Sequence, residues 1–320
     1  MSFGAKLYAA ALQYWLPQVA PQIKFDFVKS EARLVFTEQI GIPARAALRH
    51  VDLIHFTSLP SLLPLRPFVA TIHDFHFARF PELLSSRSRL LWETYMRLTL
   101  RRARCVIVDD DRTVADCERF AGVPAERCRV IPLGYDPAML RVSPNRSARP
   151  YIIYAGNRAP HKRVDDLISA WRALPDDLAF DLYLTDSAKE THAGFYEEKG
   201  RSLVQLGHVS ENDIWSYIAG ASVYVQPSLA EGFGLPMLEA AVLCVPLVAT
   251  LECVPSILAS TATTYGAGDT RRLISVLESV LRDRDVRERH ARVESARARQ
   301  FTWERCASET YRAYVSVLQH

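Results

Sequence analysis

Two carboxylates lie eight residues apart around a glycine-containing stretch, in the segment 231–239 (EGFGLPMLE). Its two glycines let the backbone pass close to a ligand, and Pro236 suits the first turn of a helix starting near Leu235. Free N–H groups at a helix start can hold a phosphate group or sugar hydroxyls. Glu231 in the loop and Glu239 one turn into the helix could then reach opposite ends of one ligand. Either glutamate alone is explained as a cap or a solvated side chain, but the whole segment predicts a ligand site.

Two cations follow a glycine turn in the segment 154–162 (YAGNRAPHK), where Arg158 and Lys162 come after Gly156. Such a pair suits a diphosphate that is losing a sugar and gaining negative charge. An arginine and a lysine in a loop are usually just solvated. Together with the segment 231–239, however, they predict a site for an anionic ligand.

A histidine, His73, closes a predicted strand over residues 68–72. A single histidine at a strand end is more often a core residue with its hydrogen bonds made. Ligands of open α/β sheets, however, bind beyond the carboxyl ends of the strands, so we expect this side chain to face a cleft between domains.

The elements that must position these residues are short β-branched or aromatic runs separated by helical stretches, which is typical of parallel sheets with crossover helices. The predicted strands are 25–28, 53–56, 68–72, 105–108, 130–133, 151–154, 180–184, 203–206, 222–225 and 246–249. The predicted helices are 5–19, 86–104, 111–121, 164–174, 211–219, 235–243, 270–282 and 303–318.

A polar stretch without periodicity, residues 141–150 (RVSPNRSARP), is typical of an interdomain linker. A chain of 320 residues suits two domains that each bury a core. We therefore predict two doubly wound α/β domains, over residues 1–146 and 147–302.

Composition excludes several classes of protein. The formal net charge of +3 is too small to indicate a nucleic-acid partner. The six cysteines show neither a C-x-x-C pair nor a histidine at zinc spacing, which favours reduced thiols. No apolar run reaches the roughly 18 residues of a membrane span, and the N-terminus lacks the pattern of an export signal. We expect a cytoplasmic protein.

The Glu-x7-Glu pattern around GFGLP resembles the signature of family 4 of the retaining glycosyltransferases. The resemblance implies the GT-B fold, in which two Rossmann-like domains face a cleft. It also implies that Glu231, Phe233, Gly234 and Leu235 lie at the donor sugar and phosphates, and that Glu239 holds the ribose hydroxyls.

The turn at 154–162 resembles the Gly-Arg…Lys turn of the same family. Lys162 stands six residues after Gly156, as expected, whereas Arg158 is one position late and Asn157 occupies its usual place. The family commonly has a histidine that contacts the donor sugar, which implies that role for His73. The terminal helix, 303–320, resembles the family's helix that crosses back to the first domain.

The activity implied is transfer of a hexose, with retention of configuration, from a nucleotide diphosphate sugar to a glycan or lipid-linked acceptor hydroxyl. The segments around His73 and 160–162 resemble bacterial mannosyltransferases of polysaccharide assembly, so GDP-mannose is our expected donor, and we expect no further cofactor. An alternative is a catalytically silent binding or scaffolding subunit, because Cys244 and Ser256 stand where the family usually has Gly and Glu. A nicotinamide-dependent Rossmann enzyme is disfavoured, since no G-x-G-x-x-G follows a predicted strand.

Three aspartates, Asp109, Asp110 and Asp111, follow the predicted strand 105–108. Read as a D-x-D motif, the outer two would bind a divalent ion, as in the other large glycosyltransferase fold. Alternatively, Asp110 caps the next helix, with carboxylates at the positive end of its dipole. We favour the cap, because Arg158 and Lys162 already neutralise a diphosphate, and we expect no metal.

The helix 86–104 combines many arginines with a stripe of Leu91, Tyr95 and Leu98. Such a helix either lies on an anionic membrane, here the inner face of the plasma membrane, or is a solvated face over a packed stripe. Both readings are open on the sequence.

A family member normally opens with a β-strand and a glycine-containing loop, whereas here Met1 arrives almost at the first helix. The first strand is central in a sheet of order 3-2-1-4-5, so its loss would leave buried backbone groups unpaired at about 1–3 kcal/mol each. We expect the first domain to lack this strand, and about 10–20 upstream residues to supply it.

Overall fold

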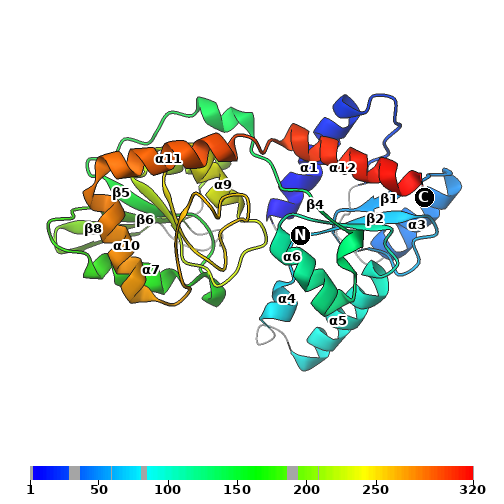
Figure 1. Cartoon of the computed structure of the whole chain (residues 1–320), viewed down its shortest axis with the longest axis horizontal. Coiled ribbons are helices and arrows are strands. Elements are labelled where there is room, and N and C mark those ends of the chain that lie inside the picture. Colours follow the sequence, from blue (N-terminus) through cyan, green and yellow to red (C-terminus); the bar gives the residue numbers. More distant parts are fainter. Residues whose placement is uncertain are drawn as a thin grey trace. The chain divides into compact units, whose positions relative to one another are not determined.

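The computed structural model describes residues 3–28, 37–58, 60–80, 85–185, 194–207 and 209–319. The chain forms two compact units (Figure 1): unit 1 comprises residues 1–134 and 302–320, and unit 2 comprises Tyr135–Phe301. Residues 135–146, which we predicted to end the first domain, therefore belong to unit 2. The terminal helix belongs to unit 1, where it lies against the first helix.

Unit 1 contains a four-stranded parallel sheet of order β1-β2-β3-β4. Its strands are β1 (Ile54–Phe56), β2 (Phe68–Ile72), β3 (Cys105–Val108) and β4 (Cys128–Val130). Its α-helices are α1 (Phe3–Val19), α3 (Ile42–Leu48), α4 (His76–Arg79), α5 (Ser86–Leu100), α6 (Asp111–Asp116) and α12 (Trp303–Leu318). Every residue of β2 and β3 is buried, as expected for parallel strands covered on both faces.

The strand predicted over residues 25–28 is wrong, because this stretch makes no sheet pairing in the structure. Asp26 instead forms ion pairs with Arg45 (2.8 Å) and Arg49 (3.0 Å). Within the described residues, β1 is the edge of the sheet and pairs only with β2. The expectation that upstream residues complete this sheet stays a prediction.

Unit 2 contains a seven-stranded sheet of order β11-β10-β9-β5-β6-β8-β7, parallel except for β7. Its strands are β5 (Tyr151–Tyr154), β6 (Asp181–Thr185), β7 (Gly194–Glu198), β8 (Arg201–Gly207), β9 (Val223–Gln226), β10 (Leu247–Thr250) and β11 (Thr263–Tyr265). Its α-helices are α7 (Val164–Ala173), α8 (Glu211–Gly220), α9 (Leu235–Val242), α10 (Thr270–Arg282) and α11 (Arg284–Ala298).

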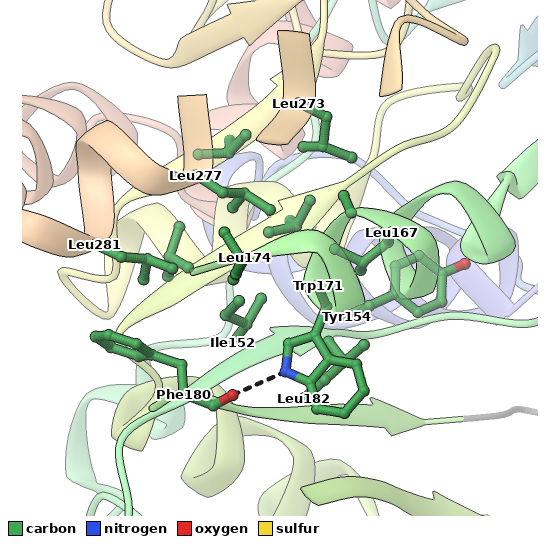
Figure 2. Packing of buried hydrophobic residues seen from close by; sticks show 14 of the residues in the cluster. Ile152, Tyr154, Leu167, Trp171, Leu174, Phe180, Leu182, Leu273, Leu277 and Leu281 are labelled. Carbon is green, nitrogen blue, oxygen red and sulfur yellow. Dashed lines mark hydrogen bonds between the residues drawn. The ribbon is translucent and has the colours of Figure 1, made fainter. Parts of the chain in front are cut away.

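The core of unit 2 packs α7 and α10 onto the middle of the sheet (Figure 2). Three leucines of α10 recur at a spacing of four residues and make one apolar stripe: Leu273, Leu277 and Leu281. Trp171 of α7 is fully buried, and its Nε1 donates a hydrogen bond to the Phe180 carbonyl at 2.8 Å. This packing fixes β5 and α7, and therefore the turn that joins them.

None of the helices within the described ranges is long and apolar enough to cross a bilayer.

Candidate functional site

The segment 231–239 has the predicted loop-to-helix geometry. Gly234 lies directly before α9 with φ at +83°, in the left-handed region that favours glycine. Pro236 lies in the first turn of the helix, which begins at Leu235 as predicted. The Phe233 side chain is buried in unit 2, so only its backbone is available to a ligand. Glu239 is half-buried further along α9.

The carboxylate of Glu231 meets the ammonium of Lys162. Glu231 Oε2 lies 2.6 Å from Lys162 Nζ, and the two side chains are only 12% and 14% exposed. The other oxygen, Oε1, accepts hydrogen bonds from Gln226 Nε2 (2.8 Å) and Ser228 Oγ (2.7 Å). Neither Lys162 nor Glu231 is therefore a solvated loop residue, and Glu231 is not a simple helix cap.

Backbone contacts join the turn after β5 to the loop after β9. The N–H of Leu229 donates to the carbonyl of His161 at 2.8 Å. From this turn, Gly156 donates its N–H to Thr185 Oγ1 at the end of β6, at 3.0 Å. A Cβ at Gly156 would lie 2.6 Å from the Tyr154 hydroxyl. Two segments some 70 residues apart thus form one site at the carboxyl ends of β5 and β9, where ligands of α/β sheets bind.

Arg158 lies elsewhere on the same turn. Its side chain is exposed and lines a hollow of about 430 Å³ with residues of α7, β7 and β8, including Asp165, Arg172 and Tyr196. In the described part of the chain, the structure does not bring Arg158 to the Lys162–Glu231 pair. A role for Arg158 at the diphosphate stays a prediction.

In unit 1, His73 follows β2 and pairs with Asp109, which follows β3. His73 Nδ1 lies 2.5 Å from Asp109 Oδ2, and the aspartate is 1% exposed. His73 Nε2 is buried and makes no hydrogen bond to the described residues. The ring of Tyr8 packs edge-on against the imidazole, with the ring centroids 5.1 Å apart. Asp109 is thus the partner of His73, whereas the sequence suggested it only as a metal ligand or as a carboxylate near a helix start.

The neighbouring aspartate has the predicted role as a cap. Asp110 accepts a hydrogen bond from the N–H of Arg112 at 3.1 Å at the start of α6. Asp109 instead pairs with His73 through Oδ2. Within the described ranges, no three His, Cys, Asp or Glu side chains form a group that could hold a metal ion.

The pKa values of two histidines of unit 1 shift in opposite directions. Burial alone would lower the pKa of His73, but the Asp109 carboxylate outweighs it and raises that pKa above its ordinary value. Burial lowers the pKa of His55 to about 3, and its ring nitrogens lie 2.6 Å from the Tyr314 hydroxyl and 2.7 Å from Thr71 Oγ1. We therefore expect the His55 imidazole to be neutral.

We expect ¹⁵N NMR titration of the imidazoles to place the pKa of His73 above about 6.5. The His55 imidazole should stay neutral over the pH range in which His73 titrates. In Asp109→Asn, burial acts without the opposing charge, so the pKa of His73 should fall below about 6.5. An unchanged His73 titration in that variant would contradict the pairing.

Comparisons with known proteins were made for the sequence and the structure. Residues 137–299 match the family model described as "Glycosyl transferases group 1", and residues 10–139 match "Glycosyltransferase Family 4". The chain is 26% identical over 267 residues to the O-antigen chain mannosyltransferase B of Escherichia coli, covering 77% of this chain and 69% of that protein.

Solved structures share the fold. The Anabaena protein Alr3699/HepE in complex with UDP-glucose superposes with a TM-score of 0.71 at 18% identity, covering 99% of this chain and 97% of that one. The glycosyltransferase WaaG, involved in lipopolysaccharide biosynthesis, superposes with a TM-score of 0.65 at 16% identity, covering 99% and 94%. The family models define the chain as a glycosyltransferase, and the solved structures show that it has the GT-B fold. The chain belongs to the glycosyl transferases group 1 family, as its signature at 231–239 indicated.

Proposed function

We propose that this protein transfers a hexose, with retention of configuration, from a nucleotide diphosphate sugar to a hydroxyl of a glycan or lipid-linked acceptor. The observation that carries the proposal is the Lys162–Glu231 pair beside the start of α9. A partly buried cation, a held carboxylate and a helix start together offer groups for a diphosphate and for sugar hydroxyls.

In the proposed reaction, the bond between the sugar C1 and the diphosphate oxygen breaks and a bond from C1 to the acceptor oxygen forms. The electron pair of the broken bond leaves with the diphosphate, which gains negative charge, and a diphosphate oxygen accepts the proton of the acceptor hydroxyl. Lys162 and the start of α9 stabilise that charge, while Glu231 orients the sugar and Glu239 holds the ribose. No metal or further cofactor is part of the proposal.

The donor we propose is GDP-mannose. The likeness to a protein named as a mannosyltransferase supports it, at 26% identity. The HepE structure instead contains UDP-glucose, at 18% identity. The two relatives thus favour different donors, and a direct comparison of nucleotide sugars is required.

We expect GDP-mannose to raise the melting temperature more than UDP-glucose or ADP-glucose does. A ligand at a hundred times its Kd stabilises by about 2.7 kcal/mol, or roughly 5–10 °C for a domain of this size. Glu239→Ala should reduce the shift, whereas the control Glu197→Ala on exposed β7 should not. The shift should survive EDTA. A shift that requires manganese would contradict the metal-free proposal, and the absence of any shift would contradict the donor site.

The silent-subunit alternative rested on Cys244 and Ser256. Cys244 follows α9 with φ at +58°, in the left-handed region where glycine is least strained. The Cys244 thiol is exposed and free. A cysteine in place of the family's glycine therefore strains the backbone at this position but removes no side chain that could bind a ligand. This observation, together with the paired Lys162 and Glu231, favours an active enzyme.

We also propose that unit 1 contacts an anionic membrane through α5. Leu91 and Leu98 are 71% and 52% exposed, so the reading of a packed stripe is wrong for both. The loop before β2 adds exposed Leu63 and is held near the end of α5 by a hydrogen bond from Arg102 to the Leu62 carbonyl at 2.5 Å. Exposed leucines beside arginines are typical of helices that lie in a membrane interface.

Sedimentation with lipid vesicles tests the membrane contact. The protein should bind vesicles that contain anionic lipid and not zwitterionic ones. Leu91→Ser with Leu98→Ser should abolish binding, and the control Leu318→Ser, also at an exposed leucine, should not. Equal binding by the double variant would contradict the assignment to α5.

A further inference from the structure

Three buried polar side chains lie in a row behind Glu231. Tyr224, Gln226 and Ser228 are 0%, 3% and 0% exposed, and they come from β9 and the loop after it. The Tyr224 hydroxyl lies 2.7 Å from Gln226 Oε1, and Gln226 Nε2 lies 2.7 Å from Ser228 Oγ. Both Gln226 Nε2 and Ser228 Oγ donate to Glu231 Oε1, at 2.8 and 2.7 Å.

In each hydrogen bond of this row, the donor lies on the side of Tyr224 and the acceptor on the side of Glu231. Because the Tyr224 hydroxyl donates to Gln226 Oε1, the amide group is oriented with Nε2 toward Glu231. Ser228 accepts from that amide and so directs its own hydrogen to the carboxylate. A reversed amide would place its oxygen against the carboxylate. Tyr224 therefore determines how Glu231 is held, although it does not contact Glu231.

The two oxygens of Glu231 have separate partners. Oε2 pairs with Lys162, while Oε1 takes both hydrogen bonds from the row. Lys162 can therefore leave Oε2 for a diphosphate without releasing the carboxylate.

The row also contacts the turn that carries Lys162. The Tyr224 hydroxyl lies 3.2 Å from the carbonyl of Ala155, directly before Gly156. On the other side, Thr250 Oγ1 of β10 donates to the Ser228 carbonyl at 2.5 Å. The row is thus fixed between three neighbouring strands, β5, β9 and β10.

We propose that Tyr224, Gln226 and Ser228 are positioning residues that keep the Glu231 carboxylate oriented toward the donor sugar when Lys162 turns to the diphosphate. This inference rests on the proposed function. It deepens that function by assigning a role to three residues outside the predicted site.

Removal of single oxygen atoms tests the proposal. Ser228→Ala and Tyr224→Phe should lower kcat by about 10–100-fold, because a small misplacement of a reacting group is costly. The KM for the donor should change much less. Two matched controls come from the same unit and are also buried, each 4% exposed: Ser295→Ala and Tyr265→Phe should retain the kcat of the wild type. A rescue variant, Ser228→Thr, keeps the hydroxyl and should recover part of the loss.

A double-variant cycle separates positioning from a general structural effect. In a Glu231→Gln background, Ser228→Ala should lower kcat little further, because the row acts only through Glu231. If Ser228→Ala lowers kcat by the same factor in the wild-type and Glu231→Gln backgrounds, the positioning role is overturned. Wild-type kcat in Ser228→Ala and Tyr224→Phe would overturn it too. Neither result would contradict the proposed function. An inactive but folded wild type would overturn the proposed function and the positioning role with it. If Ser228→Ala does not fold, Tyr224→Phe takes its place in the same cycle and tests the positioning role.

Discussion

Lys162→Ala is expected to lower kcat by about 10²–10³-fold, the range typical of removing one group that stabilises developing charge. In the free protein Lys162 is compensated by Glu231 at 2.6 Å. The diphosphate carries more negative charge in the transition state than in the bound donor, so the cation should contribute more to turnover than to donor affinity. The KM for the donor should therefore change much less than kcat, as measured by steady-state kinetics.

Two variants accompany this measurement. Lys162→Arg keeps the charge and should retain more activity than the alanine variant. Lys24→Ala removes an exposed lysine of unit 1 and should behave as the wild type. Circular dichroism must show that Lys162→Ala is folded, because it leaves the mostly buried Glu231 carboxylate without its cation. Wild-type kinetics in a folded Lys162→Ala variant would exclude this residue from the site.

Trp171→Ala should have the largest effect on stability, a loss of about 3–5 kcal/mol in the free energy of unfolding. The indole is 1% exposed, donates to the Phe180 carbonyl, and has the Arg201 guanidinium above it at 5.4 Å. The variant removes these contacts and leaves a cavity between α7 and the sheet (Figure 2).

Urea unfolding measures that loss, and hydrogen exchange locates it. The amides of unit 2 should lose protection, whereas those of unit 1 should not. Trp15→Ala, at a half-buried tryptophan of unit 1, should lower the free energy of unfolding by less than Trp171→Ala does. An equal loss in the two variants, or unchanged protection in unit 2, would contradict the assigned core.

Central strands were predictable from the sequence. The strands β2, β3 and β5 begin and end at the predicted residues, because all three are mainly apolar runs buried on both faces. The strands β7 and β11 were not predicted: β7 is exposed at the edge, and β11 has only three residues. The helix α11 was missed since its charged sequence gives little apolar periodicity.

Side-chain partners were less predictable than elements. The motif at 231–239 and the position of Lys162 indicated one site, and the structure joins them. The sequence did not show that Asp109 would meet His73, because the two residues follow different strands and only the parallel register of β2 and β3 brings them together. The alternation of Tyr224, Gln226 and Ser228 was a signal for one face of a strand, but their hydrogen bonds to Glu231 depend on the loop geometry.

The most direct test of the central claim follows the donor and the product together by NMR. The protein is incubated with GDP-, UDP- or ADP-sugars, with a mannose-terminated oligosaccharide as acceptor, and with water as the competing acceptor. The account predicts that GDP is released from GDP-mannose in step with a new glycosidic signal of the same anomeric configuration as the donor, and that Glu231→Ala abolishes both. No release of nucleoside diphosphate from any donor by the folded wild type, or equal release by Glu231→Ala, would contradict it.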